Sequence, residues 1–130
     1  LGEAWTVAKK SNLDLEKTFK GIAASSGNSF VHETESQVIL NGSYNINFTM
    51  DLVLKDTGLF DDLAKKLNAP LEISPKIVEI FKDGQKKYGS RAWSSMIVKR
   101  MEDLNNIDFR AGGFPEELID NEPEEKGYEI

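Results

Sequence analysis

The most regular pattern in the chain covers residues 48–67, which read FTMDLVLKDTGLFDDLAKKL. Apolar side chains recur at i, i+7, i+8, i+11 and i+15, in the order Leu52, Leu59, Phe60, Leu63 and Leu67. This spacing places them on one face of an α-helix. Ala69-Pro70 follows, and a residue before proline is disfavoured in the helical conformation, so we expect the helix to end there.

Upstream, the first residues indicate a helix that is already under way. Leu1, Ala4, Trp5 and Ala8 lie at i, i+3, i+4 and i+7, and no capping side chain precedes them. We interpret this as a helix entered partway, whose Leu1/Trp5 face would be left uncovered without a preceding segment. It should end near Asn12, and Asp14 should cap a second helix that runs to Ala24.

Further helices are expected on both sides of the central one. Residues 29–40 predict a less regular helix that ends at Asn41-Gly42, although Asn-Gly is also typical of a β-hairpin between residues 38–40 and 44–46. Ser74-Pro75 should open another helix that Gly89 closes. A last helix is predicted from Ser90 to Asn105, with one apolar face formed by Trp93, Met96, Ile97, Met101 and Leu104. The predicted fold class is therefore an all-α helical bundle.

Composition restricts the class of protein. The chain has 130 residues, of which 39% are hydrophobic and 29% charged, which is typical of one globular domain. It has no cysteine, so disulfides, thiolate nucleophiles and zinc thiolates are excluded. Aliphatic runs such as Val38-Ile39-Leu40 are three residues long, far below the roughly 20 that a membrane span needs. We expect a soluble, cytoplasmic domain without membrane association.

The net charge is concentrated at one end of the sequence. Residues 1–110 hold 15 Lys/Arg and 15 Asp/Glu, whereas residues 111–130 hold seven acidic side chains against Lys126 alone. The whole net charge of −6 therefore belongs to the last twenty residues. Nucleic-acid binding is disfavoured because it depends on Lys and Arg that neutralise phosphates. We divide the chain into a helical domain over residues 1–105 and an irregular acidic extension over residues 106–130.

Most catalytic motifs are missing from this sequence. His32 is the only histidine, and with Glu33 and Glu35 it does not form a His-Glu-x-x-His metal motif, so we predict no metal site. The sequence contains no Gly-x-Ser-x-Gly nucleophile motif, which disfavours a hydrolase. It also contains no Gly-x-Gly-x-x-Gly, so no dinucleotide-binding fingerprint is present.

Lys55 does not fit the pattern of an ordinary surface helix. It follows Leu52 by three residues and precedes Leu59 by four, so it projects along the apolar face. One interpretation is structural: the lysine stem lies on the apolar surface, or its ammonium pairs with Asp51 one turn earlier. The other is functional: the ammonium is directed at an anionic or hydroxyl-bearing ligand held against the helix.

The order Phe48-x-x-Asp51-Leu52-x-x-Lys55-Asp56, then Ala69-Pro70-Leu71, then Gly89 before a final amphipathic helix resembles a known domain. It is similar to the C-terminal domain of the β-hydroxyacid dehydrogenases, the 3-hydroxyisobutyrate and 6-phosphogluconate dehydrogenase-like group. Gly2-Glu3-Ala4, Leu13-Asp14 and Ser29-Phe30 match as well, and the resemblance covers roughly residues 1–105.

The resemblance implies the helical half of a two-domain oxidoreductase that uses NAD or NADP and acts on a small hydroxy acid. In that family an N-terminal Rossmann domain binds the dinucleotide, and a catalytic lysine stands early in the interdomain helix. This lysine would lie upstream of Leu1, since Lys9 and Lys10 come too late in the first helix. We therefore expect no catalytic residue in this chain and no activity from the chain alone.

The resemblance also assigns three site residues and a mode of assembly. Lys55 corresponds to the lysine that contacts the cofactor from the helical domain, and Phe48 and Asp56 correspond to positions beside the substrate and nicotinamide. The domain would face its own Rossmann domain and form a homo-oligomer. The alternative, from the residues alone, is a free-standing helical protein-interaction module whose acidic tail recruits a basic partner.

Overall fold

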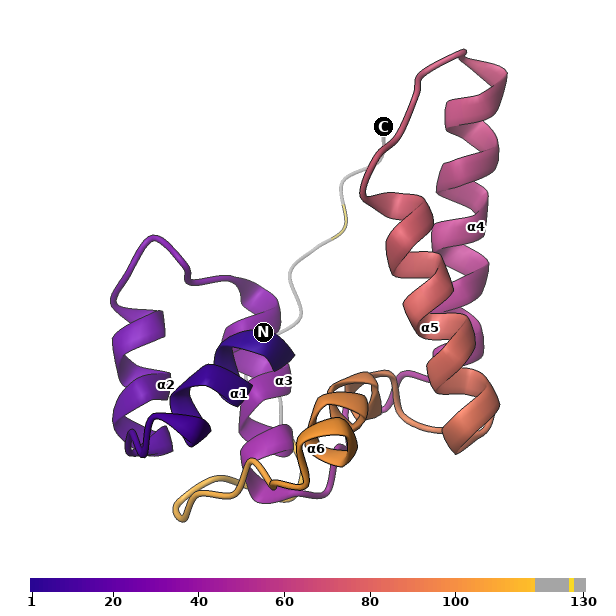
Figure 1. Cartoon of the computed structure of the whole chain (residues 1–130). Helices are drawn as coiled ribbons and strands as arrows, with labels where there is room; N and C mark the ends of the chain where they lie inside the picture. Colours follow the sequence, from indigo (N-terminus) through magenta and orange to yellow (C-terminus); the bar gives the residue numbers. More distant parts are fainter. Residues whose placement is uncertain (119–126, 128–130) are drawn as a thin grey trace.

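The computed structural model describes residues 1–118 and residue 127, and this part of the chain is helical (Figure 1). Its only pairing of strand type is an isolated antiparallel bridge between Thr49 and Trp93. The prediction of an all-α fold is confirmed. The elements are α1 (Gly2–Lys10), α2 (Leu15–Ala23), α3 (Phe30–Asn41), α4 (Met50–Lys66), α5 (Ser74–Tyr88), the 3-10 helix η1 (Ser94–Val98) and α6 (Lys99–Asn105).

The helix ends follow local side-chain chemistry. Asn12 has a left-handed φ of 55° after α1, and the Asp14 carboxylate accepts a hydrogen bond from Lys17 N at 2.9 Å to cap α2. Ser29 Oγ accepts from His32 N at 3.0 Å and caps α3 in the same way. Val38, Ile39 and Leu40 belong to α3, so the alternative of a β-hairpin at Asn41-Gly42 is wrong.

The last predicted helix begins later than expected. Residues 90–93 are not helical, because their backbone pairs with the start of α4 instead: Met50 N donates to Ala92 O at 2.9 Å and Asp51 N donates to Ser90 O at 3.1 Å. The chain then forms η1 and only afterwards α6. Leu104, expected on the inward face, is 73% exposed.

The hydrophobic core lies among α1, α2, α3, η1 and α6. It contains Trp5, Ala8, Leu15, Ile39, Leu40, Tyr44, Val98 and Phe109. The expectation of an uncovered Leu1/Trp5 face is wrong for Trp5, which is fully buried and stacks on His32 with ring centroids 5.9 Å apart. Leu1, at the end of α1, is 40% exposed.

The helices α4 and α5 pack on each other as a hairpin that stands to one side of the other helices (Figure 1). Close packing at its base depends on Gly84: a Cβ there would lie 2.5 Å from Ile97 Cδ1 and 3.3 Å from Met50 Sδ. Much of its apolar surface is open, and the exposed side chains are Leu59, Phe60, Leu63, Leu67, Ile73 and Ile77. None of the helices described here is long and apolar enough to cross a membrane.

Residues 106–118 contain no helix or strand, yet they pack on the core. Phe109 is fully buried, and Phe114 meets Phe19 edge to face with ring centroids 5.1 Å apart. Ala111 N donates to Leu40 O at 3.0 Å. Residues 106–118, the first part of the predicted extension, therefore pack against α2 and α3. Most of its acidic residues lie outside the described residues.

Candidate functional site

The three predicted site residues lie at the base of the α4–α5 hairpin. Phe48 precedes α4, and Lys55 and Asp56 lie in its second turn. The segment before α4 is fixed by the chain after α5, because Phe48 O accepts a hydrogen bond from Ser94 N at 2.7 Å. The bridge from Thr49 to Trp93 continues this pairing. The backbone of residues 48 and 49 is therefore paired with that of residues 93 and 94.

Asp51 is engaged at the start of α4 and does not pair with Lys55. Its carboxylate accepts hydrogen bonds from the Thr49 hydroxyl, from Leu52 N at 3.0 Å and from Arg91 Nη1 at 3.2 Å. The bond from Thr49, together with those from Arg91 and Leu52, lowers the pKa of Asp51. The predicted ion pair between Asp51 and Lys55 is wrong, because the Asp51 carboxylate is already hydrogen-bonded at the start of α4.

Lys55 instead pairs with Asp56, its neighbour in the chain. The Nζ to Oδ1 distance is 3.2 Å, and the two side chains are 60% and 56% exposed. An exposed ion pair of this kind contributes little to folding. The ammonium has three donors, and among residues 1–118 and 127 Asp56 is the one carboxylate within salt-bridge distance, so donors remain for a ligand.

The dinucleotide cofactor that the resemblance implies can be compared with this face. Phe48 is 37% exposed and offers an aromatic surface, while Lys55 offers donors to hydroxyl, carbonyl or phosphate oxygens. These groups fit one side of a polar, anionic dinucleotide. They lie on an open surface rather than in an enclosed pocket, so a second wall would have to come from elsewhere.

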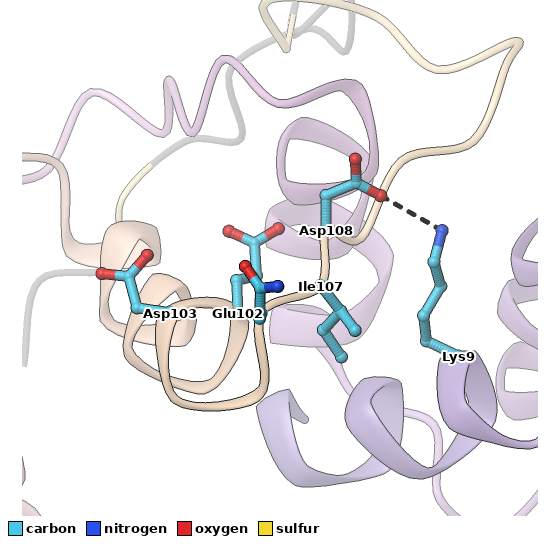
Figure 2. Close-up of a pocket in the computed structure, with 6 residues that line it drawn as sticks. Lys9, Glu102, Asp103, Ile107 and Asp108 are labelled. Carbon is cyan, nitrogen blue, oxygen red and sulfur yellow. Dashed lines mark hydrogen bonds and ion pairs between the residues drawn. The ribbon is translucent and has the colours of Figure 1, made fainter.

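A separate depression lies between α1 and α6 (Figure 2). The Lys9 ammonium pairs with the Asp108 carboxylate across it at 3.1 Å. Asp103 accepts from Lys87 Nζ and from Tyr88 Oη, each at 2.7 Å. The Lys9–Asp108 pair joins α1 to the segment after α6, and Asp103 is paired with the end of α5. We therefore interpret these charged side chains as structural.

His32 has a structural role. It is fully buried, its Nδ1 lies 3.0 Å from Ser36 Oγ and its Nε2 lies 3.0 Å from Phe19 O. Its ring also packs on Phe19, with centroids 4.6 Å apart. Among the described residues, no group of three or more His, Cys, Asp or Glu could hold a metal ion.

Comparison with known proteins identifies the family. The family model described as "NAD-binding of NADP-dependent 3-hydroxyisobutyrate dehydrogenase" matches residues 1–101. The chain belongs to this family.

Named relatives are hydroxyacid dehydrogenases. The L-threonate dehydrogenase of Haemophilus influenzae is 28% identical over 97 residues, which are 75% of this chain and 32% of that protein. The 2-(hydroxymethyl)glutarate dehydrogenase of Eubacterium barkeri is 30% identical over 113 residues, 86% of this chain and 38% of that protein. The chain therefore spans about a third of the length of these relatives.

A solved structure shares the fold. The crystal structure of 3-hydroxyisobutyrate dehydrogenase from Salmonella typhimurium superimposes with a TM-score of 0.70 at 25% sequence identity. The match covers 76% of this chain and 35% of that one. The helical arrangement is thus one found within a larger dehydrogenase of the 3-hydroxyisobutyrate dehydrogenase family.

A polar cluster formed by Tyr44, Glu102 and Arg110 was not predicted from the sequence of this family member. Glu102 is 2% exposed and lies on the inward face of α6. The sequence pattern did not indicate this burial, because helical spacing places Glu102 on the side opposite the expected apolar face of Ile97, Met101 and Leu104. Its partners lie in other segments, so spacing alone did not identify them.

Proposed function

We propose that this chain is the helical domain of an NAD(P)-dependent oxidoreductase that acts on a small hydroxy acid. In this proposal a Rossmann domain of the same cytoplasmic protein binds most of the dinucleotide. The family match over residues 1–101 supports the enzyme class. The observation that carries the site is that Phe48 and Lys55, just before and within the first two turns of α4 at the base of the hairpin, are both exposed.

The cofactor, when bound, supplies the hydride acceptor for oxidation of the hydroxy acid. Lys55 would donate hydrogen bonds to the cofactor's oxygens and so help to hold it against the helical domain. Phe48 would offer an apolar surface that excludes water beside the reacting groups, and Asp56 pairs with the Lys55 ammonium at 3.2 Å. Positioning of this kind contributes much of an enzyme's rate enhancement.

The proton-transferring group is not assigned to this chain. Lys9 pairs with Asp108 at 3.1 Å and is not placed near Phe48 or Lys55 by any contact in the structure. We propose that the catalytic lysine belongs to another part of the same protein, as the family pattern implies. The 130-residue chain alone should then show no cofactor reduction with any hydroxy acid.

The test is Lys55→Met in the full-length enzyme, with Lys65→Met as a matched control. Lys65 lies on the same helix, is 77% exposed and also pairs with a carboxylate, that of Asp62 at 3.2 Å. Loss of a charge-assisted hydrogen bond to a ligand should lower kcat/KM by roughly 10- to 150-fold and weaken cofactor binding. Lys65→Met should change neither, and both variants should keep the Tm. Unchanged cofactor binding in Lys55→Met would contradict the assignment.

We also propose that the open face of the α4–α5 hairpin forms the contact between subunits of a homo-oligomer. Leu59, Leu63 and Leu67 lie on one side of α4 and are all more than half exposed. Apolar patches of this kind usually mark an interaction surface. This arrangement supports a second role for the hairpin, away from the base where Lys55 lies.

A further inference from the structure

The side chains of Tyr44, Glu102 and Arg110 form a closed hydrogen-bonded cluster between α3 and α6. The Tyr44 hydroxyl donates to Glu102 Oε2. Arg110 Nη1 donates to Glu102 Oε1 at 2.9 Å, and Arg110 Nη2 donates to Tyr44 Oη at 2.9 Å. Phe109 N donates to the same carboxylate at 2.8 Å. A buried carboxylate is costly unless its oxygens are satisfied, and here three different groups satisfy them.

The cluster is centred on Tyr44, which lies in the loop between α3 and α4. Ser95 Oγ donates to the Tyr44 carbonyl at 2.6 Å, so this residue is held at its backbone as well as at its ring. Its φ is 55°, an unusual conformation for a non-glycine residue that only strong surrounding contacts maintain. Asn47, further along the same loop, also has a φ of 55°.

The loop leads directly to the candidate site. Residues 45–47 join Tyr44 to Phe48, whose carbonyl accepts from Ser94 N at 2.7 Å. The loop is therefore anchored by hydrogen bonds at two residues: Tyr44 next to the core and Phe48 next to the hairpin. Any shift of Tyr44 changes the path of residues 45–47 and, through them, the placement of Phe48 and of the first turns of α4.

We propose that Tyr44, Glu102 and Arg110 are positioning residues that set Phe48 and Lys55 in register with the cofactor by fixing the loop between α3 and α4. This inference rests on the proposed function of Lys55 and Phe48. The three residues act through the loop and contact neither cofactor nor substrate. The segment after α6, which carries Phe109 and Arg110, thereby becomes part of the site's support.

The first test is hydrogen–deuterium exchange of the amides of residues 45–48 in the 130-residue protein. Tyr44→Phe keeps the ring and removes the hydroxyl. Ser36→Ala is the matched control, because it also removes one buried hydroxyl, the one that lies 3.0 Å from His32 Nδ1, within α3. Exchange at residues 45–48 should rise about tenfold in Tyr44→Phe and by less than about twofold in Ser36→Ala. Equal exchange in the two variants would overturn the proposal.

The second test is equilibrium cofactor binding and steady-state kinetics of the full-length enzyme. Tyr44→Phe should raise the cofactor Kd and KM by roughly 5- to 30-fold, a loss on the scale of one hydrogen-bonded contact, with a smaller change in kcat. Ser36→Ala should leave both within about twofold at a similar loss of Tm. Arg110→Lys is a milder variant, because it retains the charge and the bond from Tyr44 to Glu102, and its cofactor KM should lie between those of Tyr44→Phe and wild type.

Lys55→Met separates this inference from the proposed function. If Lys55→Met weakens cofactor binding and Tyr44→Phe does not, the positioning role is wrong and the assignment of Lys55 stands. If Lys55→Met leaves the cofactor Kd unchanged, the proposed function fails and the positioning role fails with it, whatever the exchange data show. If both variants raise the Kd and Ser36→Ala does not, both are supported.

Discussion

The guanidinium of Arg110 occupies the space that a side chain on Gly42 would need. A Cβ at position 42 would lie 2.5 Å from Arg110 Nε and 2.9 Å from Cζ. Gly42 also has a φ of 96°, which residues with a side chain rarely adopt. Two independent constraints, one conformational and one steric, therefore require glycine at the end of α3.

Gly42→Ala should lower the free energy of unfolding by about 1–3 kcal/mol, because the backbone strain and the displacement of Arg110 act together. Urea denaturation of the purified chain measures this. Gly21→Ala is the control, since no atom lies within 4 Å of a Cβ built there and Gly21 lies within α2. That change should be neutral or stabilise by up to about 1 kcal/mol. Equal effects at the two positions would contradict the account of Gly42.

His32→Ala should destabilise the chain by about 2–4 kcal/mol, because it leaves a cavity beside Trp5 and two unpaired buried groups, Ser36 Oγ and Phe19 O. Zinc chloride or EDTA added to the wild-type protein should leave its Tm unchanged, since we predict that the histidine packs and does not ligate. A metal-dependent rise in Tm that disappears in His32→Ala would show that the structural assignment is wrong.

Paired replacement of Phe60 and Leu63 by lysine should convert a homo-oligomer to monomers, because charged side chains oppose burial of the hairpin face. The two residues are 55% and 54% exposed. Leu104→Lys is the control, on α6 and 73% exposed, and it should leave the oligomeric state unchanged. Multi-angle light scattering measures the masses. A wild-type protein that is monomeric at high concentration would contradict the proposed subunit contact.

Asp103 should contribute stability that is lost in acid. Hydrogen bonds from Lys87 and then Tyr88 hold its pKa below the ordinary value of 3.8. A carboxylate with a depressed folded-state pKa contributes fully above its unfolded pKa, and the contribution disappears as pH falls through the lower folded value. Asp103→Asn should therefore lower stability by about 0.2–1 kcal/mol near pH 7, as exposed pairs do, and the difference should shrink as the pH falls below 3.8. A difference that does not shrink in acid would show that the loss has another cause.

Helix positions were predictable where a signal is local. Asp14 caps α2 and Gly89 follows α5 as expected, because a cap depends on residues within one turn. The break before η1 was not predictable in this way. It depends on the pairing of residues 90–94 with residues 48–51, and neither segment has the alternating pattern of a strand.

The candidate site was predicted through the resemblance, and its role remains a prediction. Periodicity drew attention to Lys55, but its partner is Asp56 and not Asp51, since Arg91 from a distant segment pairs with Asp51. The Tyr44–Glu102 contact joins residues 58 positions apart, and no helical or strand period connects such positions. The apolar face of the hairpin was predicted from the spacing of its side chains in the sequence. That no other described segment covers this face could not be predicted in the same way.

The bridge between Thr49 and Trp93 would be the pivot of any rotation of the α4–α5 hairpin relative to the other helices. The chain enters and leaves the hairpin at that one end. The 17 residues of α4 extend about 25 Å from it at 1.5 Å per residue. A rotation of about 5° at the pivot then moves the far end by about 2 Å, while Lys55, in the second turn, moves by less than about 1 Å. Rotation about this end of the hairpin therefore displaces Lys55 much less than it displaces the outer end.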